Sequence, residues 1–156
     1  MRVQIDDSGW PIVVVTTPRH VMEPQEHAEY LDLLTNFHTR GQMFGFIFDV
    51  RLSPPPPAEQ RRQLAERIDR DAKRFERRAP CALVVATGIQ SGVVKVIQWL
   101  LRDPHPVQVF TSVEAARQWL ETTWALRAPK SSKLPSSKPP SSKPPSSKPP
   151  SSNSPA

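Results

Sequence analysis

Apolar runs and amphipathic segments alternate along most of the chain, and their order predicts an α/β domain. Five apolar, β-prone segments are predicted strands: residues 2–6, 12–16, 44–51, 79–87 and 105–110. Four segments with the apolar spacing of a helix lie between or after them: residues 23–40, 58–78, 91–101 and 111–121. We therefore expect one small domain with five strands and about four helices, in which the strand at residues 44–51 is central.

Turn and cap residues indicate where these elements begin and end. Residues 6–9, Asp-Asp-Ser-Gly, form a predicted turn between the first two strands. Pro24 suits the first turn of the first helix, and Gly41 suits the position just beyond its end. Thr111 and Glu114 have the spacing of a capping box, so we expect Thr111 to cap the last helix.

The helix predicted at residues 58–78 buries only a narrow apolar stripe. The stripe comprises Leu64, Ile68, Ala72, Phe75 and Ala79. The remaining face is dense in charge, and Glu66 with Arg70 has the i, i+4 spacing of an ion pair. Such a face usually serves solvation, and the alternative is a docking surface for an acidic partner.

The two remaining helices differ in how much apolar surface they carry. The helix at residues 91–101 is apolar on nearly every side, so we expect it to be sunk in the domain. Partial exposure toward a partner is the alternative for this helix. The last helix is amphipathic, and we expect Trp119 to point into the core together with Leu120.

A pentapeptide repeat, Ser-Ser-Lys-Pro-Pro and its variants, fills residues 131–155. Proline at this density excludes helices and strands, and the repeat has no side chains that build a core. We expect residues 129–156 to be a disordered, polyproline-II-biased spacer and residues 1–128 to be the folded domain. A weak anion-binding arm and a phosphoserine-regulated or proline-recognised ligand are the alternatives.

Charge is divided unevenly between these two parts. The chain has 156 residues, with 21 Lys and Arg, 15 Asp and Glu, and a formal net charge of +6. Five lysines and no acids lie beyond residue 128, which leaves 16 basic and 15 acidic residues, a net charge of +1, in the domain. Because the basic excess belongs to the tail, the domain itself offers no strong case for binding nucleic acid.

Cysteine content and hydropathy bear on the compartment. Cys81 is the single cysteine, which excludes an internal disulfide and fits a reducing compartment. Residues 1–10 carry two adjacent acids and no apolar stretch, so we expect no signal peptide. No apolar run reaches the roughly 18–20 residues that a membrane span needs. These features favour a cytoplasmic protein.

The sequence contains no combination of side chains typical of catalysis or metal binding. His27 and His38 lie on one predicted helix about 16 Å apart along its axis, too far to share a metal. We interpret Glu23 and His27 as exposed polar residues, and Cys81 as a structural thiol at the start of a buried strand. None of the five glycines forms a phosphate loop. We expect a protein that is not an enzyme and has no cofactor.

Residues 77–120 contain, in order, an arginine-rich helix end, an alanine-valine strand, an apolar helix ending in Trp-Leu, and a proline-containing turn. A valine-phenylalanine strand and a helix ending in Glu-Ala-Ala-Arg-Gln-Trp-Leu follow. Residues 48–51, Phe-Asp-Val-Arg, supply a central strand that ends in an aspartate. In these features the chain resembles the bacterial SpoIIAA-like proteins, which are grouped with the STAS and SEC14-like domains. The resemblance covers most of residues 1–126 and excludes the tail.

This resemblance implies a mixed five-stranded sheet with helices packed mainly on one face. It also implies a fold used for regulatory protein–protein interaction, as in anti-sigma-factor antagonists, or sometimes for lipid-like ligands. STAS antagonists carry a phosphorylatable serine at the start of the helix after the central strand. Ser53 is the nearest serine here, but four prolines follow it in place of the Asp-Ser-Ser-Gly type of motif. A turn hydroxyl is the alternative role for Ser53.

These observations favour a regulatory protein–protein interaction module that binds a protein partner. An acidic partner would suit the basic helix face. The candidate partner surface comprises Asp49, Ser53, Arg62, Arg70 and Arg74, and Ser53 is the candidate phosphosite. Two alternatives stay open. One is a SEC14-like binder of an apolar small ligand, and the other is a scaffold component that uses its proline-rich tail as a spacer. The sequence leaves the partner and the oligomeric state open.

Overall fold

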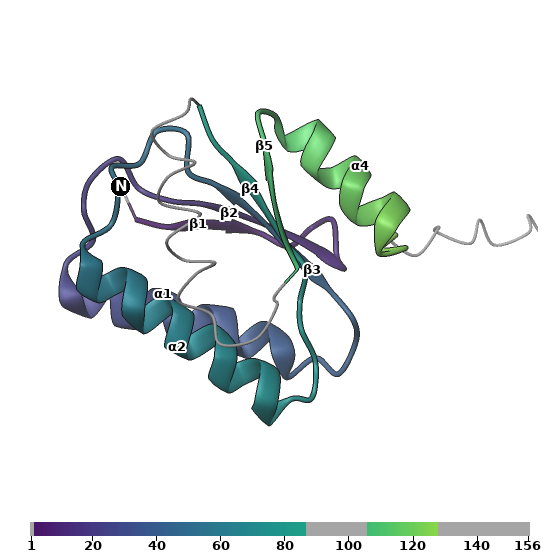
Figure 1. Cartoon of the computed structure of the whole chain (residues 1–156), viewed down its shortest axis with the longest axis horizontal. Helices are drawn as coiled ribbons and strands as arrows, with labels where there is room; N and C mark the ends of the chain where they lie inside the picture. The colour runs from purple at the N-terminus through teal and green to yellow at the C-terminus, as the bar shows by residue number, and fades with distance from the viewer. Residues whose placement is uncertain (1, 87–105, 128–156) are drawn as a thin grey trace, which may run out of the picture.

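The computed structural model describes residues 2–86 and 106–127, which form a five-stranded sheet with helices on both faces (Figure 1). The strands, β1 (Gln4–Asp6), β2 (Ile12–Thr16), β3 (Gly45–Asp49), β4 (Cys81–Val84) and β5 (Val107–Phe110), lie side by side in chain order. β1 runs antiparallel to β2, and all other neighbours are parallel. The expected mixed five-stranded sheet with a central third strand is confirmed.

The turn between β1 and β2 lies where the sequence predicts it. The carboxylate of Asp6 accepts hydrogen bonds from the backbone N–H of Ser8 at 3.0 Å and from its hydroxyl at 2.6 Å. The backbone N–H of Trp10 donates to the carbonyl of Asp7 at 3.0 Å. These local bonds replace the strand pairing that the chain gives up when it reverses direction.

Alternate residues of the strands point to opposite faces of the sheet, and each face has its own core. Val13 and Val15 of β2 lie in one core together with Phe46 of β3. Ile12 of β2 and Ile47 of β3 lie in the other. A strand that is apolar at successive positions thus has both sides covered, as the run at residues 12–16 predicted.

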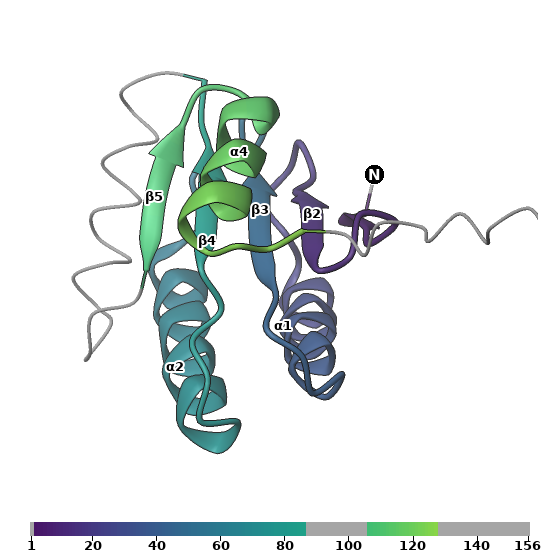
Figure 2. The same cartoon turned by 90° about the vertical axis from the view of Figure 1, so that its right-hand side faces the viewer.

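Helices α1 (Pro24–His38) and α2 (Ala58–Arg74) cover the first of these faces. Helix α4 (Val113–Thr123) lies across the opposite face, against β3, β4 and β5 (Figure 2). The described helices therefore lie on both faces, two on one and one on the other. The helix predicted at residues 91–101 and the tail predicted at residues 129–156 lie outside the described residues.

Two helix ends on the α1 and α2 face follow local backbone geometry. Gly41, just after α1, has a φ of 74°, so the predicted glycine stop is confirmed. Helix α2 ends at Arg74 rather than at residue 78. Glu76 adopts a φ of 50°, in the left-handed region, which ends the helix one turn earlier than the charge pattern suggested.

The start of α4 lies one residue later than expected. Its N-cap is Ser112, whose hydroxyl accepts a hydrogen bond from the backbone N–H of Ala115 at 3.2 Å. Serine satisfies one of the free amides of the first turn in this way. The predicted capping box of Thr111 and Glu114 is therefore wrong, since both serine and threonine are good caps and the sequence offers two neighbouring choices.

Candidate functional site

A partly enclosed cavity of about 140 Å³ lies between the sheet and the helices α1 and α2. Its apolar wall is contributed by segments that are far apart in the sequence. The apolar lining includes Met22, Phe48, Leu64, Ile68, Leu83 and Val107. The cavity is therefore built from α2, the segment before α1, and three neighbouring strands.

The cavity reaches the edge of the sheet where β2 and β3 end. Thr17 and Pro18 follow β2, and Val50 and Ser53 follow β3, and all four line the cavity. In α/β proteins, ligands bind outside the carboxyl ends of parallel strands, because the loops diverge there. The position of the cavity agrees with that rule.

The proline segment between β3 and α2 forms part of the same wall. Pro54, Pro55 and Pro56 line the cavity, and the carbonyl of Pro56 accepts a hydrogen bond from Nη1 of Arg61 at 2.8 Å. Proline fixes φ near −65°, so three in a row hold this wall with little loss of chain entropy on folding. The segment that follows Ser53, a member of the candidate partner surface, thus forms part of the cavity wall.

The hydroxyls of Ser53 and Thr17 are hydrogen-bonded to each other. Thr17 Oγ1 also donates to the backbone carbonyl of Asp49 at 3.2 Å, which makes Ser53 the donor toward Thr17. This pair ties the end of β2 to the segment after β3. Ser53 thus has the turn role considered above, and its phosphorylation stays a prediction.

The carboxylate of Asp49 is occupied by its neighbour Arg51. Nε of Arg51 donates to Oδ1 at 2.9 Å and Nη2 donates to Oδ2 at 2.7 Å. These hydrogen bonds hold the pKa of Asp49 below its ordinary value, against the opposing effect of burial. Asp49 does not line the cavity, so its side chain orders the turn rather than the wall.

Arg62 on α2 is held by acids one turn away on either side. Its Nη2 lies 2.8 Å from Oε1 of Glu59, and its Nη1 lies 3.7 Å from Oε1 of Glu66. The predicted pairing of Glu66 with Arg70 is therefore wrong. Arg70 is exposed and makes no ion pair within residues 2–86 and 106–127.

The five residues of the candidate partner surface do not form one site. Ser53 is the member that lines the cavity, whereas the three arginines project from α2. Arg62 and Arg74 are separated by about 18 Å along the helix, at a rise of about 1.5 Å per residue. The guanidinium of Arg74 lies over the ring of Phe75, 5.1 Å from its centroid. The structure divides the predicted surface into a cavity wall and a basic helix face.

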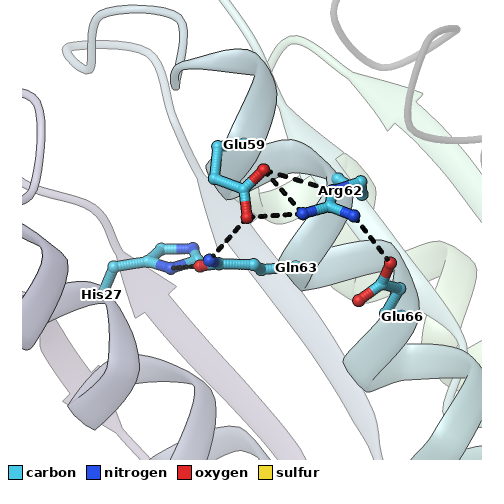
Figure 3. A network of polar contacts seen from close by, with 5 residues as sticks. All are labelled: His27, Glu59, Arg62, Gln63 and Glu66. Atoms are coloured by element: carbon cyan, nitrogen blue, oxygen red, sulfur yellow. Dashed lines mark hydrogen bonds and ion pairs between the residues drawn. The ribbon is translucent and has the colours of Figure 1, made fainter.

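Two residues of α1 belong to the cavity and were not among the candidates. His27 is 3% exposed and Tyr30 is 5% exposed, and both line the cavity. The interpretation of His27 as an exposed residue is therefore wrong. Its Nδ1 lies 3.1 Å from Oε1 of Gln63, a partner 36 residues away on α2 (Figure 3). The sequence signal that could have shown the burial of His27 is its spacing with Tyr30, Leu31 and Leu34, which puts all four on one face of the helix.

Cys81 is buried at the start of β4, as the sequence predicted, and it lines the cavity. Burial raises the pKa of its thiol to about 12. The group is therefore protonated at neutral pH, which suits packing rather than nucleophilic attack.

Within residues 2–86 and 106–127, no group of three or more His, Cys, Asp and Glu side chains is arranged to hold a metal ion. Nor does this part of the chain contain a helix with the length and apolar character needed to cross a membrane. Comparison with family models, with curated proteins and with solved structures found no significant match. The cavity and the basic face of α2 are therefore the features on which a function can be argued.

Proposed function

We propose that this chain is a non-enzymatic binding module that holds an apolar small molecule in the cavity between the sheet and helices α1 and α2. The observation that carries the proposal is the chemistry of the cavity wall. Most of the lining is apolar, and the hydroxyls of Thr17 and Ser53 already bond to each other. The amide of Gln60 donates to the carbonyl of Met22 at 2.7 Å. The wall therefore offers apolar surface with few free polar groups.

An apolar cavity of this size favours an apolar guest over water. An engineered cavity of about 150 Å³ lined by Leu, Ile and Phe stays dry and binds benzene. The cavity in this protein has nearly the same volume, about 140 Å³. Each Å² of apolar ligand surface removed from water contributes about 25 cal/mol to binding. A single aromatic ring or a short alkyl chain is therefore the matching guest.

The experiment is an NMR titration of the full-length ¹⁵N-labelled protein with toluene. We expect saturable shifts of amides around the cavity, and we expect Leu83→Phe to weaken binding at least tenfold by filling the space. Leu33→Phe is the matched control, because Leu33 is 44% exposed on α1 and does not line the cavity. The control variant is expected to bind toluene like the wild type.

Two results would contradict the proposal. One is the absence of saturable shifts up to the solubility limit of toluene. The other is an equal loss of binding in the Leu83 and Leu33 variants, which would place the contact outside the cavity. Unfolding curves of both variants establish that each is folded before the titrations are compared.

The regulatory protein–protein interaction module predicted from the sequence is the second candidate, and the outer face of α2 favours it. Arg70, Lys73 and Arg74 are exposed on the C-terminal half of this helix. Arg62 is committed to Glu59 and Glu66, so the basic surface offered to an acidic partner is smaller than the sequence suggested. Positive potential of this kind steers acidic partners and accelerates association.

Charge reversal tests this second candidate. Arg70→Glu with Arg74→Glu is expected to weaken the capture of an acidic partner, more strongly at low salt than at high salt. Arg2→Glu with Arg19→Glu is the control, because both residues are exposed and the change in net charge is equal. Equal capture by the two double variants would remove α2 as the interaction surface.

A further inference from the structure

His27 and Tyr30 place two hydrogen-bonding atoms at the cavity, one turn apart on α1. Their ring centroids lie 6.1 Å apart, and both side chains are more than nine-tenths buried. Nδ1 of His27 is bonded to Gln63, but Nε2 of His27 and the hydroxyl of Tyr30 have no hydrogen-bond partner among the described residues. Both residues line the cavity, so these two atoms offer a ligand the hydrogen bonds that an otherwise apolar wall lacks.

The network around Gln63 determines which nitrogen of His27 carries the hydrogen (Figure 3). Hydrogen bonds from Arg62 and Gln63 keep the pKa of Glu59 below its ordinary value, so Glu59 is a carboxylate and only accepts. The amide nitrogen of Gln63 therefore faces Glu59, at 2.9 Å, and its carbonyl oxygen faces His27. Since that oxygen also only accepts, Nδ1 of His27 is the protonated nitrogen.

The imidazole is neutral at pH 7. Burial lowers the pKa of His27 below its ordinary value, and the charge of Arg67 acts in the same direction, against the hydrogen bond with Gln63. A neutral imidazole with its hydrogen on Nδ1 presents an unprotonated Nε2. His27, which lines the cavity, therefore offers it a hydrogen-bond acceptor. Burial also raises the pKa of Tyr30, so the neighbouring phenol keeps its proton and can donate.

We infer that the ligand is an apolar molecule carrying one hydroxyl group, a phenol or a short-chain alcohol, whose proton is accepted by Nε2 of His27 and whose oxygen accepts from the hydroxyl of Tyr30. This inference rests on the proposed function and names the ligand class for the same cavity. A hydroxyl is the small group that both donates and accepts. A carboxylate would face the lone pair of His27 and lose its hydration, so the cavity selects against fatty and aromatic acids.

The test compares phenol with toluene, which differ by a hydroxyl in place of a methyl group. Phenol loses more hydration than toluene on entering any apolar site, so the informative quantity is how the ratio of the two affinities changes between wild type and variant. Affinities are measured by NMR titration of the full-length protein at pH 7.5. We expect His27→Leu to weaken phenol binding about tenfold and to leave toluene binding within about twofold.

A second variant keeps the test valid if the buried His27→Leu variant fails to fold. Gln63 is exposed, and Gln63→Met removes the oxygen that holds the hydrogen on Nδ1. We expect this variant to lower the affinity for phenol relative to toluene. Gln25→Met is the matched control on α1, where Gln25 is exposed and bonds Glu29 rather than a cavity residue. Imidazole ¹⁵N shifts provide an independent readout, with hydrogen on Nδ1 in the wild type and on both nitrogens in exchange in Gln63→Met.

The outcomes separate this inference from the proposed function. If toluene binds but the phenol-to-toluene ratio is the same in wild type and variants, the hydroxyl assignment is overturned and the apolar site stands. A wild-type imidazole with hydrogen on Nε2 also overturns it. If neither compound binds, both the inference and the proposed function fail.

Discussion

Gly45 of β3 lies directly against Leu126, the third residue after the end of α4 at Thr123. A Cβ atom at position 45 would lie 2.8 Å from Cδ1 of Leu126 and 3.0 Å from Cδ2 of Leu120. Both leucines are buried, and the carbonyl of Pro80 would lie 3.2 Å away on a third side. Helix α4 thus approaches the sheet this closely because position 45 has no side chain.

The first prediction is that Gly45→Ala destabilises the fold by about 1–3 kcal/mol, the usual cost of overpacking. Alanine is otherwise no worse than glycine in a strand, so a loss identifies the steric contact as its cause. Gly9→Ala is the control, since the nearest atom there is Nη1 of Arg117, at 3.0 Å on a long side chain that can move. Urea unfolding measures both free energies, and equal values for the two variants would contradict the contact.

The second prediction concerns the core beneath α4. Leu120 is fully buried, so Leu120→Ala is expected to cost about 2–5 kcal/mol. Trp119 is half-buried at the rim of this core, where its ring is tilted against Phe110 and meets Trp124 edge-on, so Trp119→Ala should cost less than Leu120→Ala. Chemical denaturation ranks the two variants, and the reverse order would place Trp119 at the centre of the core, as the sequence first indicated.

The third prediction is a pH dependence of stability that originates in His27. In the unfolded chain His27 takes up a proton as the pH falls through about 6.5. In the folded protein, burial lowers the pKa of His27 below that value. Between the two values the unfolded state binds more protons, so the free energy of unfolding falls as the pH falls. Above about pH 7 the contribution of His27 is fully present.

Urea unfolding of the wild type and of His27→Gln at pH 7.5 and pH 5.5 checks this prediction. The wild type should lose more stability between these two pH values than the variant, because glutamine does not titrate. Identical losses in the two proteins would show that His27 has the same pKa in the folded and unfolded states.

The fourth prediction concerns the hydroxyl pair at the cavity rim. Ser53→Ala and Thr17→Val should each cost about 0.5–1.5 kcal/mol, the net value of a hydrogen bond. The double variant should cost less than the sum, because each single change already breaks the bond between them. Ser53→Asp should destabilise more than Ser53→Ala, since it introduces charge beside an apolar wall. Strict additivity of the two single changes would show that the hydroxyls do not interact.

Much of the fold could be predicted from local sequence. The β-branched run at residues 12–16 and the phenylalanine-rich run before Asp49 became buried strands, because continuous apolar residues need cover on both sides. The end of α1 before Gly41 and the turn before β2 followed from the backbone preferences of single residues. Because these features depend on residues that are neighbours in the chain, the local sequence is enough to predict them.

The candidate site could be predicted less well, because its polar residues are buried by distant partners. His27 looks like a surface residue until Gln63, 36 residues away, supplies its hydrogen bond. Asp71 belongs to the charged face of α2 in the sequence, but it is buried and accepts a 2.6 Å hydrogen bond from Thr35 of α1. Such pairs form only when α1 and α2 pack side by side, so the local sequence pattern does not predict them.

The order of the strands across the sheet has a consequence for how the chain folds. Each strand pairs with the strand that precedes it in the sequence. Three of these four pairs are parallel, and each joins strands that are 22 to 31 residues apart in the chain, so long connections must close before each pair forms and we expect slow folding. During synthesis, the strand with which each new strand pairs has already left the ribosome. We therefore expect the sheet to grow one strand at a time from the N-terminal hairpin, with the newest strand as its open edge.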